Sequence, residues 1–282
     1  MDGFPEADRY DIGGNLAAGD SDRQPLLANR HALYRPKPRN NPVLRLFCFP
    51  YAGAGAAAYR LWPNRLPEDI EVVAIHPAGR AHRLQEPPLT RVETMVESAL
   101  TVLGSLLDRP FAVFGHSLGA VVAGEFTRVL QTLGRPAAHL FVSSRPSPRG
   151  VEQQVHQLPQ DDFLDAVNAR YQGIPEDIRA HPDLLALLLP SLRADMEAFE
   201  TFRLRPDRSK IACPTTVYGG ESDQTVSWAD LESWNEETTE PCRIRVFPGG
   251  HLYLTTVPEA MLADLSMTLE LVTRPKAREA LR

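Results

Sequence analysis

The sequence predicts an α/β fold in which helices cover both faces of a mostly parallel sheet. From Val43 onward, short apolar runs typical of buried strands alternate with segments of helical spacing, and this alternation is characteristic of parallel sheets. A second observation is local: the apolar run at 111–114 leads into a Gly-x-Ser-x-Gly turn, and a helical pattern follows directly. The length of 282 residues suffices for one such domain with a large core, or for two small ones.

The strands expected from apolar or alternating runs are short. They cover residues 43–49, 72–75, 111–114, 140–143, 215–218 and 243–247. Helical spacing is clearest from Val92 to Leu107, where apolar residues recur every three or four positions on one stripe. A last helix is expected roughly from Pro258 to Leu271. The domain is therefore expected to span 43–272, with a tail at 273–282.

Residues 1–42 differ from the rest of the chain. They are rich in Gly, Asp, Asn, Pro and Arg and keep no sustained period. Segments of this composition bury too little apolar surface to fold on their own. We expect a disordered or loosely packed N-terminal extension, which could equally be a linker or a functional segment.

The most informative motif is GHSLG at residues 115–119. A strand, a Gly-x-Ser-x-Gly turn and a helix together form the nucleophile elbow of α/β-hydrolases, where a sharp turn exposes the serine hydroxyl. Glycines are needed because a Cβ at either flanking position would collide with nearby main chain. Ser117 is therefore the expected nucleophile, and His116 is too close to it in sequence to turn back on it.

A serine nucleophile needs a base and an orienting acid. In this fold they follow the serine in the order Asp or Glu, then His. Asp223 comes three residues after an apolar run that ends in two glycines, and His251 follows an alternating strand and a Pro-Gly-Gly turn. Both thus stand just beyond the C-terminal end of a strand, where open α/β sheets place their sites. We expect Ser117, His251 and Asp223 to form a catalytic triad, with Glu221 and then Asp230 as alternative acids.

The loop after the strand 43–49 is small and rich in glycine. In α/β-hydrolases one backbone amide of the oxyanion hole belongs to the residue after the nucleophile, here Leu118, and the other to a loop that leaves an earlier strand. We expect Ala52 to supply the second amide, with Tyr51 as the alternative. The loop lacks the glycine patterns of phosphate-binding loops, and a plain turn is the competing interpretation.

Between Arg145 and Lys210 the alternation of strands and helices stops. Two helical patterns replace it, at 161–171 and 182–202, and Pro190 interrupts the second. Helices inserted at this point are expected to form a lid over the serine. Part of their apolar surface would line an acyl chamber, although packing on the core explains it equally well. The chamber candidates are Leu184, Leu188, Leu192, Met196 and Phe199.

Composition limits the function classes. Hydrophobic content of 43% and charged content of 23% are ordinary for a soluble protein. No apolar run is long enough to span a bilayer, and the N-terminus lacks a signal-peptide layout, so a cytoplasmic location without membrane partners is expected. A net charge of −6 argues against nucleic acid as a partner. Three cysteines without metal-type spacing predict neither a disulfide framework nor a metal site.

Taken together, the motifs resemble those of type II thioesterases, the discrete editing enzymes of polyketide synthase and non-ribosomal peptide synthetase pathways. The resemblance covers roughly residues 43–270 and includes FPYAG at 49–53, Gly79-Arg80, GHSLG at 115–119, Asp223 and Gly250-His251. One departure is the Ala78 that separates Pro77 from Gly79, where the family often reads Pro-Gly-Arg; it does not touch the triad. The resemblance implies hydrolysis of stalled acyl groups from the phosphopantetheine arm of carrier proteins, without a metal or organic cofactor.

The same resemblance implies transient binding of acyl or peptidyl carrier proteins. Because carrier proteins are typically acidic, a locally basic docking surface is expected, although each basic residue fits an ordinary solvated face as well. The candidates are Arg80, Arg83, Arg203 and Arg205. Rival functions are an acyl-CoA or fatty-acyl thioesterase, another serine esterase, and a non-catalytic binding protein that keeps the hydrolase fold.

Overall fold

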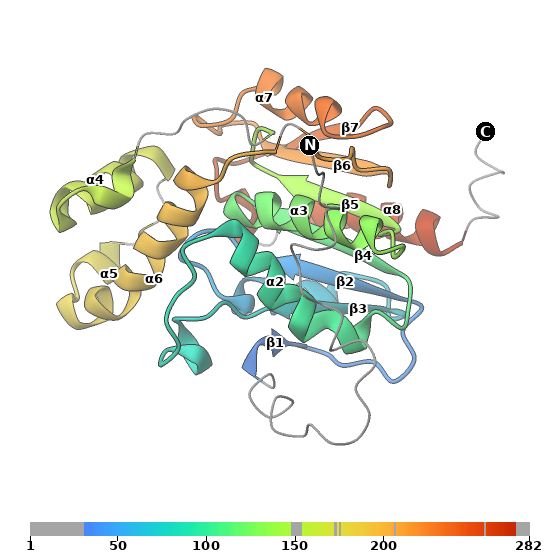
Figure 1. Cartoon of the computed structure of the whole chain (residues 1–282), viewed down its shortest axis with the longest axis horizontal. Helices are drawn as coiled ribbons and strands as arrows, with labels where there is room; N and C mark the ends of the chain where they lie inside the picture. The colour runs from blue at the N-terminus through green and yellow to red at the C-terminus, as the bar shows by residue number, and fades with distance from the viewer. Residues whose placement is uncertain are drawn as a thin grey trace, which may run out of the picture.

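A mostly parallel sheet lies at the centre of the computed structural model, which describes residues 31–147, 154–171, 174, 176–205, 207–256 and 258–274. Within these residues the sheet has seven strands in the order β1-β3-β2-β4-β5-β6-β7, and only β1 runs antiparallel to its neighbour (Figure 1). The strands are β1 (Leu33–Tyr34), β2 (Leu44–Phe49), β3 (Ile70–Ile75), β4 (Phe111–His116), β5 (His139–Ser143), β6 (Thr215–Gly220) and β7 (Arg243–Phe247). This arrangement confirms the predicted fold class.

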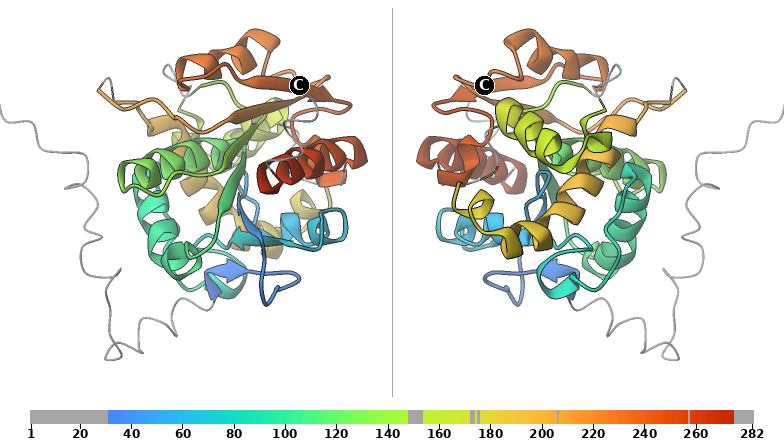
Figure 2. Two further views of the ribbon diagram at one scale, coloured as in Figure 1. Left: turned by 90° about the vertical axis from the view of Figure 1, so that its right-hand side faces the viewer. Right: turned by 90° about the vertical axis from the view of Figure 1, so that its left-hand side faces the viewer.

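Helices cover both faces of the sheet, as Figure 2 shows from two sides. The helices are α2 (Val92–Leu103), α3 (Leu118–Thr132), α4 (Gln160–Tyr171), α5 (Glu176–Arg179), α6 (Pro182–Thr201), α7 (Trp228–Glu232) and α8 (Glu259–Thr273). Short 3₁₀ helices are η3 (Ala56–Tyr59), η4 (Trp62–Asn64), η5 (Ala81–Arg83), η6 (Gly104–Leu106), η7 (Val155–Gln157), η8 (Ser233–Glu236) and η9 (Tyr253–Thr256). No helix in the described ranges combines the length and the hydropathy that crossing a membrane requires.

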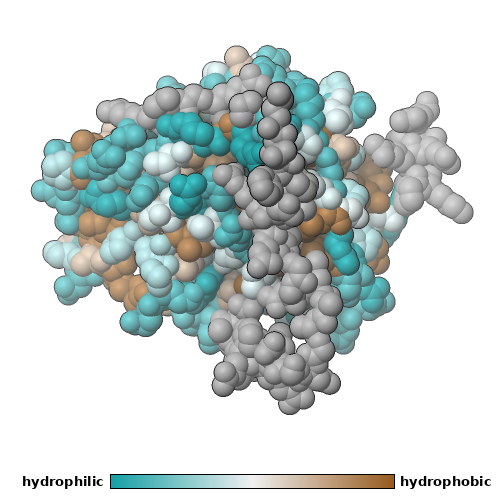
Figure 3. Space-filling view, in the orientation of Figure 1, coloured by the Kyte–Doolittle hydropathy of each residue, from teal (hydrophilic) through white to brown (hydrophobic). Residues whose placement is uncertain are grey.

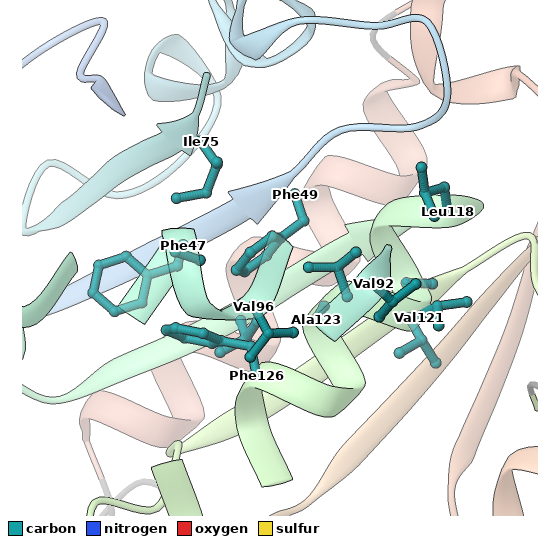
Figure 4. Packing of buried hydrophobic residues seen from close by; sticks show 14 of the residues in the cluster. Phe47, Phe49, Ile75, Val92, Val96, Leu118, Val121, Ala123 and Phe126 are labelled. Carbon is teal, nitrogen blue, oxygen red and sulfur yellow. The ribbon is translucent and has the colours of Figure 1, made fainter. Parts of the chain in front are cut away.

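Alternate residues of the strands enter two separate cores, because successive side chains point to opposite faces of a sheet. Phe47 on β2 packs in one core with α2 and α3, where it meets Phe126 (Figure 4). Its neighbour Leu46 belongs to the other core, which also holds Trp62 from η4 and Leu265 from α8. Burial on both faces fixes the central strands, and hence the loops that leave their carboxyl ends.

All six expected strands are present, and most extend one or two residues beyond the predicted range. The boundary of the N-terminal extension, however, was predicted wrongly. Leu33 pairs with Ile75 in β1, and Arg35 donates hydrogen bonds of 2.8 and 2.5 Å to Glu71. A strand of two residues is too short to leave a periodic signal, so the sequence does not reveal it. Residues 1–30 and 275–282 lie outside the described residues.

The helices α4, α5 and α6 are inserted between β5 and β6 and lie together at one end of the sheet (Figure 1, left). These three helices fall within the range of about 145–210 that is expected to form a lid. The expected interruption at Pro190 does not occur, because α6 continues through it. Proline removes one backbone donor from a helix, and the surrounding turns retain the helical path in spite of that loss.

Candidate active site

Ser117 lies on the sharp turn between β4 and α3. Its backbone angles are φ 52° and ψ −117°, a conformation that a residue other than glycine rarely adopts. A Cβ on Gly115 would lie 2.0 Å from the carbonyl oxygen of Gly119, and a Cβ on Gly119 would lie 2.2 Å from that of Phe49. The structure therefore has the strained elbow that GHSLG predicts, and both glycines are required by close backbone approach.

The structure brings Ser117, His251 and Asp223 together in a hydrogen-bonded chain. His251 Nε2 lies 3.0 Å from Ser117 Oγ, and His251 Nδ1 lies 2.9 Å from Asp223 Oδ2. Asp223 and His251 are carried by the loops that follow β6 and β7, so parallel strands deliver both to the same edge of the sheet. Of the alternative acids, Glu221 is exposed and Asp230 forms the capping box of α7 with Ser227.

Thr225 is a member of the site that was not expected from the sequence. Its backbone N–H and its hydroxyl donate to Asp223 Oδ1 over 2.9 and 2.7 Å, and its Oγ1 also lies 2.9 Å from His251 Nδ1. Burial alone would raise the pKa of the Asp223 carboxyl, but the hydrogen bonds from His251 and Thr225 outweigh burial and lower it. Asp223 is thus an anion with a fixed orientation, and it keeps the imidazole proton on Nδ1 and leaves Nε2 free to act as a base.

His116 points away from Ser117, as its position in the motif led us to expect. Its Nδ1 lies 2.9 Å from Ser143 Oγ, which in turn lies 2.7 Å from the hydroxyl of Tyr253. The His116 ring is 5.5 Å from that of His251, centroid to centroid. Burial, followed by the neighbouring His251, lowers the pKa of His116 well below its ordinary value. His116 is therefore neutral, and it adds no second positive charge beside His251.

The two expected oxyanion amides lie on neighbouring segments. Strands β2 and β4 are adjacent, and Phe49 is paired with Gly115, so the loop after β2 lies beside the elbow. Leu118 is the first residue of α3, and its N–H has no acceptor within the helix. Among the described residues, the Ala52 N–H also has no hydrogen-bond partner, and Tyr51 and Ala52 both border the cavity at Ser117. Either loop residue remains a candidate for the second donor.

A cavity of about 250 Å³ opens at Ser117 and His251, below the lid helices. Its apolar wall includes four of the five predicted chamber residues: Leu188, Leu192, Met196 and Phe199. The prediction of Leu184 was wrong, because this side chain is 47% exposed and does not line the cavity. Leu184 occupies the first turn of α6 but faces solvent, whereas its neighbour Leu185 lines the cavity.

The other side of the cavity is formed by residues that no sequence pattern marks. Val167 and Tyr171 on α4, Ile174 after it and Ile178 on α5 line the chamber. The Tyr171 ring lies 4.9 Å from that of His251, centroid to centroid. In Figure 3, apolar residues are visible on the side of the molecule that α5 and α6 form. The periodic signal in α4 is weak because polar and charged residues occupy half of its positions.

Of the four expected docking arginines, one is buried and a second is largely buried. Arg80 is buried and donates to both carboxylate oxygens of Asp195, and Arg83 is largely buried and donates to the carbonyl of His76 and to Glu86. The docking role predicted for Arg80 is therefore wrong, because its charge is buried and paired with Asp195. The docking role of Arg83 stays a prediction. The charges along the chain do not show which arginines are paired in the fold. Arg203 and Arg205 are exposed, and Arg205 pairs with Asp207.

The fold and this site define an α/β-hydrolase with a serine, histidine and aspartate at the carboxyl edge of the sheet. Comparisons with known proteins give the family. A family model described as a thioesterase domain matches residues 44–268. The chain therefore belongs to the thioesterase family, and it is an enzyme that acts on thioester bonds.

Comparison with individual relatives shows which thioesterases this chain resembles. The chain is 36% identical over 236 residues to the gramicidin S biosynthesis protein GrsT of Aneurinibacillus migulanus, a match that covers 83% of this chain and 91% of GrsT. It is 35% identical over 246 residues to the thioesterase PikA5 of Streptomyces venezuelae, with 86% of each chain covered. Among solved structures it is similar to the type II thioesterase BorB of the borrelidin biosynthetic cluster, with a TM-score of 0.74, 29% identity and coverage of 83% of this chain and 94% of BorB. The resemblance to type II thioesterases is confirmed.

Proposed function

We propose that this chain hydrolyses stalled or aberrant acyl groups from the phosphopantetheine thiol of carrier proteins in polyketide or non-ribosomal peptide biosynthesis. Ser117 is the nucleophile, His251 the general base and acid, and Asp223 the residue that orients His251. The observation that carries the proposal is the 3.0 Å contact between His251 Nε2 and Ser117 Oγ at the floor of an apolar cavity. The pathway-associated relatives support the choice of substrate class.

In the acylation step, His251 Nε2 accepts the proton of Ser117 Oγ as that oxygen attacks the thioester carbonyl. The C–O bond forms, and the carbonyl oxygen takes up the negative charge. The N–H groups of Leu118 and of Ala52, or of Tyr51 in its place, donate to this oxyanion. Loss of a single such donor costs roughly 2.7–4 kcal/mol of transition-state stabilisation in other serine hydrolases. Collapse of the intermediate breaks the C–S bond and leaves the acyl group on Ser117.

Release of the thiol needs little assistance from the protein, because a thiol is a good leaving group. A thiol with a pKa of about 8.5 departs more readily than an amine, and the His251 imidazolium can return its proton to the sulfur. Water then enters, His251 Nε2 takes one of its protons, and hydroxide attacks the acyl-enzyme carbonyl. The C–O bond to Ser117 breaks, Oγ regains a proton from His251, and the free acid leaves. Protein side chains, backbone amides and water supply every group that these steps use.

The apolar chamber is the proposed site for the acyl group. Leu188, Leu192 and Phe199 form a wall that removes a hydrocarbon chain from water, and this burial is worth about 0.8 kcal/mol for each methylene. The polar side chains that line the cavity are those of Ser117, His251, Tyr51 and Tyr171. An acyl chain placed against α6 would have its carbonyl beside Ser117 and His251.

Intact-mass analysis of loaded carrier proteins tests the proposal. Carriers that hold acetyl, propionyl, butyryl and longer acyl groups are incubated with the wild type and with the matched control Ser117→Ala. We expect deacylation by the wild type alone. If the carriers stay loaded while acyl-CoA or oxygen esters are cleaved, the proposed substrate class is wrong and an acyl-CoA thioesterase or esterase takes its place. A wild type that cleaves none of these and does not react with a fluorophosphonate would be a non-catalytic binding protein.

Carrier docking has its own test, since Arg203 and Arg205 are the exposed members of the predicted set. Replacing both with Glu is expected to slow turnover of an acidic acyl carrier at low ionic strength, where charges at the surface are least screened. Turnover of the same acyl group on CoA should stay unchanged and is the control. Equal rates for the variant and the wild type with the carrier would show that this segment is not the docking surface.

A further inference from the structure

A buried ion pair joins the lid to the loop that follows β3. Arg80 donates from Nη1 and Nη2 to the two carboxylate oxygens of Asp195, each over 2.8 Å. The two side chains are 6% and 3% exposed. Asp195 belongs to α6, the helix that also presents Leu192 and Met196 to the chamber. One turn of the lid therefore carries both a wall of the chamber and a buried negative charge.

The pair also holds the loop that contains the expected oxyanion donors. The backbone N–H of Gly53 donates to Asp195 Oδ2 over 2.8 Å, and Arg80 Nη1 donates to the carbonyl of Ala54 over 2.8 Å. The N–H of the Ala52–Gly53 peptide group and the carbonyl of the Ala54–Gly55 peptide group are thus anchored, one by each partner. No other charged side chain among the described residues donates to or accepts from the backbone of residues 51–54.

We propose that Arg80 and Asp195 are positioning residues for the reaction: they anchor the peptide groups on the C-terminal side of Ala52. This holds the loop in place, and with it the Tyr51–Ala52 peptide, so that the Ala52 N–H faces the oxyanion formed at Ser117. This inference rests on the proposed function. Ion pairs removed from water gain little net stability and are often replaceable by apolar side chains of similar size. The specific feature here is the second set of hydrogen bonds, which is directed at the loop backbone beside the nucleophile.

The same geometry makes α6 the element that positions two parts of the substrate at once. Leu192 and Met196 contact the acyl chamber, and Asp195 lies between them in sequence and holds Gly53. A shift of α6 would therefore move the chamber wall and the oxyanion loop together. Because catalytic groups must be held within a fraction of an ångström, such a shift is sufficient to change the rate.

Three variants test the proposal: Asp195→Asn, Arg80→Met and the double variant Arg80→Met with Asp195→Leu. The matched control is Glu71→Gln, which removes another buried carboxylate that two arginines bind, at the opposite end of β3 from the elbow edge. For each protein we would measure kcat, KM, thermal stability and the affinity for an alkyl boronic acid. The boronate forms a tetrahedral adduct with the serine and places an oxygen in the oxyanion hole.

We expect each single variant to lose about 10- to 100-fold in kcat, as a displaced catalytic group does, and a similar factor in boronate affinity, with KM nearly unchanged. The double variant should regain thermal stability relative to the single variants, because it leaves no unpaired buried charge, without regaining kcat. Glu71→Gln should lower thermal stability and leave kcat and boronate affinity at wild-type values.

Recovery of kcat together with stability in the double variant would overturn the proposal, since the pair would then serve the fold alone. Folded single variants with wild-type kcat and boronate affinity would overturn it as well. If the wild type hydrolyses no thioester, the proposed function is wrong, and kcat can no longer be used to test the role of the ion pair. The boronate affinities of the variants still decide whether the pair positions the loop.

Discussion

Substitution of Gly119 by alanine tests how the elbow is held against the oxyanion loop. The added Cβ would lie 2.2 Å from the carbonyl oxygen of Phe49 and 2.7 Å from that of Pro50. Ordinary contact begins at 3.4 Å, so the backbone of one segment must move by about 1.2 Å. Both contacted groups are main chain and directly precede Tyr51, so no side-chain rotation relieves the overlap. A displacement of about 1 Å in an active site costs roughly 100-fold in rate.

We therefore expect Gly119→Ala to fold with about 1–3 kcal/mol less stability, the usual cost of overpacking, and with kcat lowered about 100-fold. The assay is steady-state deacylation of a loaded carrier, which is followed by intact mass, together with a thermal unfolding curve. Gly104→Ala is the control, because a Cβ at Gly104 would meet nothing within 4 Å and its φ is −50°. A folded Gly119→Ala protein with wild-type kcat would refute the inferred contact between elbow and loop.

Three further predictions concern the groups behind Ser117. Asp223→Asn should lower kcat about 10⁴-fold while leaving KM similar, because an amide favours the wrong tautomer of His251; steady-state kinetics would show a loss below tenfold if the assignment is wrong. Thr225→Val should lower kcat about tenfold, since it removes a hydroxyl that donates to a charged carboxylate, and an unchanged kcat would assign Thr225 to loop structure alone. His116→Gln should flatten the pH dependence of stability below pH 6.5. The pKa of His116 is lowered on folding, so the unfolded chain binds the extra proton and wild-type stability falls as pH drops below 6.5, by at most about 1.4 kcal/mol per pH unit. Equal slopes in urea unfolding of the two proteins would contradict this.

The fold and the reacting groups could be predicted because each leaves a signal in the sequence. That signal is either a local motif or the order in which residues follow one another along the chain. Ser117 is marked by a motif whose glycines have a steric role. Asp223 and His251 follow from chain order and from the ends of two strands. Thr225 could also have been noticed, since an aspartate side chain often accepts from the backbone N–H two residues later. Its hydroxyl contact with the Asp223–His251 pair, however, depends on how two loops meet.

The predictions that failed concern residues whose surroundings come from distant segments. From the sequence alone, Arg80 is expected to be a surface charge. In the structure it pairs with Asp195, which lies 115 residues later in the chain. Leu184 belongs to a leucine-rich stretch, and the sequence does not show which of these leucines face the chamber and which face solvent. The two residues of β1 gain their structure from pairing with β3. In each case the environment of the residue is determined by tertiary contacts with distant segments. A pattern within the local segment does not predict those contacts.

In the proposed mechanism, Ser117 receives the acyl group from a carrier protein. This step is tested most directly by mixing the wild type with a carrier that holds an isotopically labelled acyl group, quenching in acid within the first turnover and mapping the peptides by mass. We predict transient labelled acylation of the peptide that contains Ser117, at the serine oxygen, and none in Ser117→Ala. Loss of the acyl group from the carrier without any adduct on Ser117, or with the adduct on another residue, would contradict the mechanism.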